Sequence, residues 1–170
     1  MKYFLIDINR SLLTSPRIVR SFDVINRRNV NMKNHKAIDK RNLMYIESNV
    51  NTIFTGVIMR PFFMLSEKLF EIAEKYESDL VTKQVVLLDV DNKVSVLYHM
   101  PILQRINCAS NREQYKNNKN INPILKKNRL PEKSLFMLED LDLPVVRLDL
   151  AESFLRREER GISLIPIEVK

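Results

Sequence analysis

Short segments rich in apolar residues punctuate the first third of the chain and predict β-strands. Tyr3 to Ile8, Leu43 to Glu47 and Ile53 to Met59 are rich in aromatic and β-branched residues. The last two are separated by the Asn-rich turn Ser48 to Asn51, so we expect them to be joined through it. Residues 1–52 otherwise have no regular apolar period and are the least readable part of the sequence.

The pattern in the second half predicts a hairpin and three further strands. Val85 to Asp89 and Val94 to Tyr98 flank Asp91 and Asn92, which are residue types that favour turns. The further strands are predicted at Leu135 to Leu138, Pro144 to Leu148 and Ile162 to Val169. Pro166 predicts an edge position or a bulge in the last of these, because proline has no backbone N–H to donate.

Two segments with helical spacing of apolar residues predict amphipathic helices. The first begins after Ser66, in the N-cap position, and ends near Tyr76. The second is predicted to be capped by Asp149 and to run to Arg160. Gly161 follows at the position where glycine commonly ends a helix.

One internal similarity organises these elements. Pro61 to Ser66 can be aligned with Pro144 to Asp149, and in both places an amphipathic helix and then a strand follow. A real structural repeat and a chance match of short segments both explain the similarity. We predict an α+β fold, with a mixed or antiparallel sheet and two short amphipathic helices, built from a β-α-β unit used twice. Residues 1–170 are expected to form one domain, with 53–170 as its repeat-containing core.

The net charge of +7 is unevenly distributed. Residues 1–60 carry eleven Lys and Arg against four Asp and Glu, and residues 103–133 carry eight against two. Residues 61–102 have four against seven, and residues 134–170 have five against eight. The polar, Asn- and Lys-rich segment 104–131 is predicted to be a long exposed basic loop. Basic regions attract nucleic acid or acidic proteins, although they also serve simply to solvate loops.

The residue types needed for catalysis do not form a workable group. Two glycines, Gly56 and Gly161, are too few for a phosphate-binding loop or a dinucleotide fingerprint. His35, His99 and Cys108 do not have zinc-site spacing, so neither metal nor cofactor is expected. His99 with Cys108 is the one available thiolate–imidazolium pair, and it leaves a cysteine-dependent enzyme as the least favoured alternative. The sequence therefore predicts a protein without a catalytic centre.

Two acidic clusters have either a catalytic or metal-binding role or a purely structural role in turns. Asp89 and Asp91 flank the predicted hairpin turn, and Glu139, Asp140 and Asp142 precede a strand. Paired carboxylates serve as acid and base or hold a divalent ion. Aspartate in turns more commonly accepts hydrogen bonds from the nearby backbone, and we favour that interpretation here.

Compartment is predicted from what the sequence lacks. The single cysteine, Cys108, cannot form an internal disulfide, which favours a reducing environment. Met1 to Ile8 is interrupted by Asp7 and is neither a secretory apolar region nor a membrane span. A cytoplasmic protein that does not insert into membranes is expected.

The residues Pro61 to Tyr76 and Leu135 to Ile167 resemble a family of bacterial immunity proteins from polymorphic and contact-dependent toxin systems. The similar features are a Ser-Glu helix start, a hairpin, a second strand–helix pair and a closing Gly-x-x-[Leu/Phe]-x-Pro segment, here Gly161 to Pro166. The resemblance covers roughly residues 53–102 and 134–169. It implies a protein that neutralises a toxin by direct protein–protein binding, without turnover or a cofactor.

The net charge departs from the acidic composition expected for an immunity protein that faces a basic nuclease. A chain at +7 suits an acidic toxin, or binds through its acidic carboxy-terminal part. Charge alone suggests a set of binding residues in the predicted basic loop: Arg105, Arg112, Lys116, Lys119, Lys126 and Lys127. A basic nucleic-acid-binding module is the main alternative function.

Overall fold

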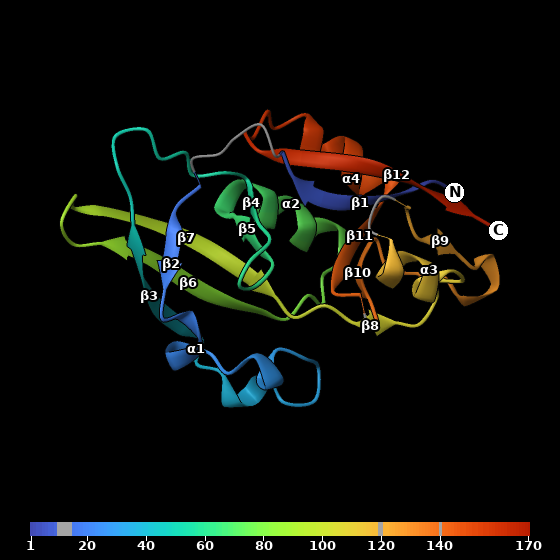
Figure 1. Cartoon of the computed structure of the whole chain (residues 1–170), viewed down its shortest axis with the longest axis horizontal. Helices are drawn as coiled ribbons and strands as arrows, with labels where there is room; N and C mark the ends of the chain where they lie inside the picture. Colours follow the sequence, from blue (N-terminus) through green and yellow to red (C-terminus); the bar gives the residue numbers. More distant parts are fainter. Residues whose placement is uncertain (10–14, 119–120, 140) are drawn as a thin grey trace.

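Two six-stranded β-sheets, with short helices packed on them, make up the computed structural model (Figure 1). It describes residues 1–9, 15–118, 121–139 and 141–170. The predicted α+β class is confirmed. Predicted residue Lys119 lies outside the described residues, and so does Asp140.

One sheet contains both ends of the chain and is called the terminal sheet. Its strand order is β8-β10-β11-β1-β12-β9. The strands are β8 (Arg105–Ile106), β10 (Leu135–Leu138), β11 (Leu143–Arg147), β1 (Tyr3–Ile8), β12 (Ile162–Val169) and β9 (Ile124–Leu125). The four inner strands are antiparallel, whereas β8 and β9 run parallel to their neighbours at the two edges. β9 meets β12 at Glu168 and Val169, so Pro166, which faces Phe4 of β1, lies beyond β9 on the edge side of β12.

The other sheet, called the central sheet, has the order β2-β3-β6-β7-β5-β4. The strands are β2 (Arg17–Val19), β3 (Arg41–Glu47), β6 (Thr82–Asp89), β7 (Val94–Pro101), β5 (Met64–Ser66) and β4 (Val57–Ile58). β3 and β6 are parallel, and the other pairs are antiparallel. The β6–β7 hairpin is confirmed, with Asp89 opposite Val94.

α2 (Glu67–Tyr76) matches its prediction, whereas α4 (Leu148–Leu155) differs from its prediction at both ends. α2 begins after Ser66, whose hydroxyl accepts a hydrogen bond from the Leu69 N–H at 3.5 Å, as expected. α4 starts before Asp149, so the predicted aspartate cap is wrong. Arg147 holds the Asp149 carboxylate through contacts of 2.8 and 2.7 Å. α4 also ends well before Arg160: Glu158 already adopts a left-handed backbone conformation with φ of 52°, so Gly161, with φ of 82°, lies beyond the helix and does not end it as predicted.

Smaller elements occupy the regions between the main strands. α1 (Ser21–Val24) and the 3₁₀ turns η1 (Arg27–Asn29) and η2 (His35–Ala37) lie below the central sheet in Figure 1. α3 (Arg112–Asn117) and the 3₁₀ turn η3 (Lys127–Arg129) lie beside the terminal sheet. The segment 104–131 is therefore not the exposed loop predicted from its composition. It supplies β8 and β9, and it buries Cys108 and Leu125.

The repeat proposed from the sequence exists as supersecondary structure. β4-β5-α2-β6 and β10-β11-α4-β12 follow the same course, and one antiparallel strand separates the last two strands of each unit. That strand is β7 in the central sheet and β1 in the terminal sheet. In the structure Ser66 corresponds to Arg147, because each is the last residue of its strand. The sequence comparison matches Ser66 with Asp149, so the structural alignment is shifted by two residues.

One predicted strand pairing is wrong. Only Val57–Ile58 of the segment Ile53 to Met59 is a strand, and it pairs with β5 instead of β3. β3 instead lies between β2 and β6. The turn after β3 is held by Asp89, whose carboxylate accepts hydrogen bonds from Ser48 N and Oγ at 2.8 and 2.5 Å.

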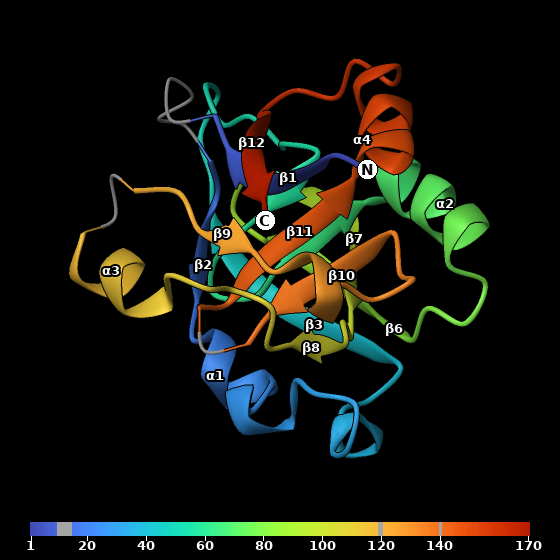
Figure 2. The same cartoon turned by 90° about the vertical axis from the view of Figure 1, so that its right-hand side faces the viewer.

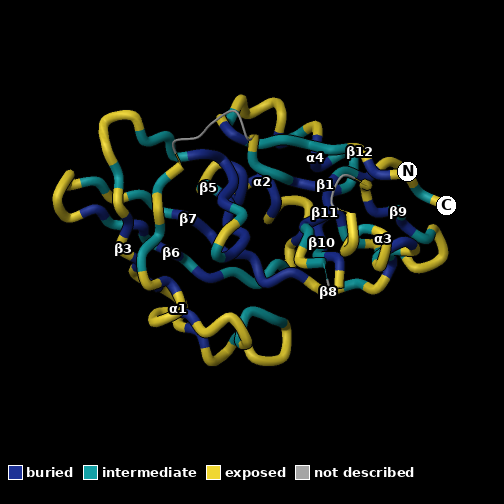
Figure 3. The backbone as a smooth tube through the Cα atoms, viewed as in Figure 1, coloured by how far each residue is buried: buried dark blue, intermediate teal, exposed yellow. Residues whose placement is uncertain are grey.

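Among the described residues, buried side chains form three clusters, and one of them joins the sheets. Figure 3 shows that buried stretches of the backbone occur in both sheets. This shared core combines Leu69 and Phe70 of α2, Leu150 and Phe154 of α4, and strand residues of both sheets such as Leu65. α2 and α4 lie side by side in Figures 1 and 2, and the Tyr76 and Ser153 hydroxyls are 2.7 Å apart. The second cluster covers one face of the central sheet with Ile25 and Ile38, and the third covers the outer face of the terminal sheet.

Candidate functional site

The second face of the central sheet is only partly covered. Along β3 the buried residues alternate with exposed ones, and Leu43 and Tyr45 remain 43% and 54% exposed. Residues paired across a sheet point to the same side. The face therefore continues over half-buried neighbours on β2, β6 and β7. We call this surface the open face, and its apolar residues are Val19, Leu43, Tyr45, Val86, Leu88 and Leu97.

α2 covers the rest of this face and marks where the open part begins. Phe70 stacks flat on His99 of β7, with ring centroids 4.0 Å apart and an angle of 1° between the planes. The opposite face of the same sheet is filled by the cluster around Ile25 and Ile38. One face of the sheet is thus fully packed, and the other is packed only at its β5–β7 end.

Carboxylates on α2 border the open face. Glu67, Glu71 and Glu74 are exposed and follow helical spacing, so they form one stripe next to Phe70. Tyr76 lies on the other flank, toward α4. These glutamates belong to the segment 61–102, where seven acidic residues outnumber four basic ones. The border is therefore acidic on the side of α2, whereas Arg41 of β3 and Arg17 of β2 place positive charge on the other side.

His99 is a buried core residue beneath α2. Among the described residues neither of its ring nitrogens has a hydrogen-bond partner. Burial lowers the pKa of His99, and the three carboxylates of the α2 stripe only partly oppose this effect. Phe4 occupies the equivalent position of the terminal sheet, because it pairs with Val146 as His99 pairs with Leu65. His99 thus takes the place of a packing residue.

The buried imidazole predicts a specific pH dependence of stability. As the pH falls, the unfolded chain takes up a proton at His99 near pH 6.5, the ordinary pKa of histidine. The folded chain takes up this proton only at a lower pH. Stability is therefore expected to fall as the pH drops below the ordinary pKa of histidine, by at most about 1.4 kcal/mol per pH unit. His99→Phe should remove this contribution. Urea unfolding of both chains between pH 8 and pH 5 would measure it, and parallel stability curves would contradict the prediction.

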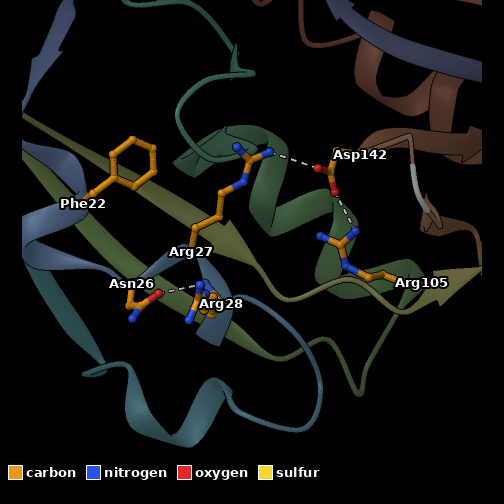
Figure 4. A pocket seen from close by; sticks show the side chains of 6 residues that line it. All are labelled: Phe22, Asn26, Arg27, Arg28, Arg105 and Asp142. Atoms are coloured by element: carbon orange, nitrogen blue, oxygen red, sulfur yellow. Dashed lines mark hydrogen bonds and ion pairs between the residues drawn. The ribbon is translucent and has the colours of Figure 1, made fainter. Parts of the chain in front are cut away.

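A second feature is a surface pocket of about 580 Å³ between the segment 21–28 and the terminal sheet (Figure 4). It is lined by Phe22, Asn26, Arg27, Arg28, Arg105 and Asp142. Asp142 lies in the β10–β11 turn with a φ of 52°. Its two carboxylate oxygens accept from Arg27 Nη2 at 3.0 Å and from Arg105 Nη1 at 2.5 Å. We call this site the arginine pocket.

Electrostatics keep Asp142 ionised in the arginine pocket. Burial works against ionisation, but the hydrogen bond from Arg105 and the charges of Arg105 and Arg27 outweigh it and lower the pKa of Asp142. Asp142 thus does not serve the backbone of its own turn, as the sequence suggested for this cluster. Asp89 does, since it accepts from the N–H groups of Ser48 and Asn92, and its pKa lies well below its usual range.

The basic residues predicted from charge are divided between two places. Arg105 lies in the arginine pocket, whereas Arg112 and Lys126 line a separate hollow of about 400 Å³. Lys116 and Arg112 contact Glu113 at 3.9 and 3.7 Å, and Lys127 is exposed. Sequence reasoning missed Arg27 and Arg28. They belong to the first basic block, but no local pattern indicates that they meet Arg105.

Cys108 and His99 belong to different buried environments. Cys108 packs among the apolar residues of the terminal sheet, and His99 packs beneath α2. Burial raises the pKa of the Cys108 thiol to about 11, which is the opposite of what a nucleophilic thiolate requires. The structure therefore does not bring the Cys108 thiol and the His99 imidazole together as a catalytic pair.

Within the described ranges, no group of three His, Cys, Asp or Glu side chains is placed to hold a metal ion. The described part of the chain has no helix long and apolar enough to cross a membrane. No protein-family model matches the sequence, and no curated protein matches it either.

Proposed function

We propose that this chain is a non-catalytic binding protein of the cytoplasm that neutralises a toxin by direct contact through the open face. The observation that carries the proposal is the uncovered part of the central sheet, where Leu43 and Tyr45 stand exposed beside half-buried apolar residues. Contiguous apolar surface of this kind marks sites of protein–protein contact. The resemblance to immunity proteins supplies the expectation that the partner is a toxin.

The composition of the open face supports a protein partner. Tyrosine contributes strongly to protein interfaces because its ring buries a large apolar area at low cost in side-chain entropy. A flat apolar sheet face with a charged border has the arrangement of an interface core and its polar rim. Tyr45 lies within this face, and charged residues such as Glu47 lie at its margin.

The charge of the border indicates which kind of partner fits. Glu67, Glu71 and Glu74 lie on the α2 side of the open face, so they favour a partner whose surface is basic where it meets this helix. The α2 side of the open face belongs to the acidic segment 61–102, whereas its β2 and β3 side belongs to residues 1–60, where Lys and Arg are in excess.

The test uses the product of the adjacent reading frame as the candidate toxin. Leu43→Lys is expected to weaken its binding by about tenfold or more, because it places a charge in the apolar centre of the interface. Leu155→Lys is the matched control, since Leu155 is 55% exposed at the end of α4, outside the open face. Affinity would be measured by calorimetry with the purified proteins.

Two results would reject the proposal. Equal weakening by both variants, or by neither, would show that the open face is not the interface. Failure of the wild-type chain to bind the adjacent gene product, together with turnover of a substrate by the chain, would remove the immunity function itself.

A further inference from the structure

The arginine pocket brings together cationic groups from segments far apart in the sequence. Arg27 and Arg28 come from η1, and Arg105 comes from β8. Asp142 is the one acidic residue among the six that line the pocket, so three positive charges face one negative charge. The pocket therefore keeps a surplus of positive charge in the described part of the chain.

Hydrogen-bond donors remain available after the internal pairs are made. A guanidinium has five N–H groups, and Arg27 and Arg105 each use one of them on Asp142. The Arg28 guanidinium has no ion-pair partner among the described residues. Fixed pairing with Asp142 also restricts the rotamers of Arg27 and Arg105, which reduces the entropy that a ligand must remove.

Phe22 supplies an apolar wall to the arginine pocket. Its ring is 56% exposed and packs edge-on against Phe62, with centroids 5.8 Å apart and an angle of 78°. An aliphatic stem can lie against this ring while its charged end reaches the guanidinium groups. The arginine pocket thus combines an apolar contact with donors for an oxyanion.

We infer that the arginine pocket binds glutamate or aspartate side chains of an acidic protein segment. Asp142 already shows that a planar carboxylate fits between two guanidiniums of this site. An acidic peptide and a phosphodiester chain both carry repeated negative charges, so the preference for the peptide rests on the planar carboxylate geometry that Asp142 presents to Arg27 and Arg105. This site is distinct from the open face and does not depend on the identity of the toxin.

The probe is a fluorescent hexaglutamate peptide, titrated with the full-length chain at low ionic strength and followed by anisotropy. Arg28→Gln is the informative variant, because Arg28 is exposed and its loss breaks no internal ion pair. The affinity of the Arg28→Gln variant for the peptide is expected to be about fivefold lower than that of the wild-type chain. Arg156→Gln removes the same charge from an exposed position after α4 and should leave the affinity unchanged.

A second titration uses labelled hexathymidylate under the same conditions. The inference predicts weaker binding of this oligonucleotide than of the peptide, and loss of peptide binding as salt rises. It is overturned if the peptide does not bind, if Arg28→Gln and Arg156→Gln have the same effect, or if the oligonucleotide binds more tightly and depends on Arg28. The last result would make the arginine pocket a nucleic-acid site and would leave the proposal for the open face untouched.

Discussion

Phe154→Ala is expected to lower the free energy of unfolding by about 3–5 kcal/mol. Phe154 is fully buried on α4 in the cluster that also contains residues of α2 and of both sheets. Removing its ring leaves a cavity that the surrounding strands and helices can close only in part, so dispersion contacts are lost as well as apolar burial. Urea unfolding followed by circular dichroism would measure the change.

The neighbouring residue provides the control for this prediction. Leu155→Ala removes an apolar side chain that is 55% exposed, and its effect is expected to stay within about 0.5 kcal/mol. Because one cluster joins the sheets, Phe154→Ala should also unfold in a single transition, like the wild type. Two separate transitions, or a loss as small as that of Leu155→Ala, would mean that the shared core does not couple the sheets.

Gly56→Val is expected to destabilise the chain by about 2–3 kcal/mol. A Cβ at this position would lie 2.7 Å from Glu159 Cβ and 3.0 Å from Leu69 Cδ1. Glu159 Cβ is attached directly to the backbone and cannot rotate away, so the segment after α4 would have to move. The backbone N–H of Gly56 also donates to the Arg160 carbonyl oxygen at 2.7 Å, and this bond would be strained or broken.

The control for Gly56→Val lies in the same connection. Asn51→Val introduces the same side chain at an exposed residue before β4, and it is expected to change stability by less than about 0.5 kcal/mol. Thermal unfolding of the two variants would show the difference directly. Equal stability of both would indicate that the segment around Glu159 moves freely and does not fix the contact between the two units.

Local interactions explain which elements could be predicted from the sequence. Ser66 caps α2 through a bond to a residue three positions away, and the β6–β7 turn closes over four residues. The Asp149 cap failed because Arg147, two residues earlier, holds the carboxylate. The β4 pairing failed because an extended segment can pair with any complementary edge, and β5 was nearer in the fold than β3.

The candidate sites depended far more on tertiary structure. Leu43 and Tyr45 could be assigned to a strand, but Met44 and Ile46, which alternate with them, are also apolar, so the sequence does not say which set is buried. Arg105 was named from charge alone, and its partners Arg27 and Arg28 are more than seventy residues away in the sequence. Packing of the segment 21–38 against the central sheet decides that they meet.

By itself, the sequence determined the α+β class and the uneven distribution of charge, because these follow from periodicity, caps and composition over short stretches, and it suggested the twice-used β-α-β unit without deciding between a repeat and a chance match. The tertiary structure alone decided that β1 completes the second unit, that segment 104–131 joins the terminal sheet, and that one face of the central sheet stays open. The physical reason is that burial and convergence are properties of pairs of distant segments. The free energy of burial depends on which surfaces the folded chain brings into contact, and a local sequence pattern does not show which surfaces these are.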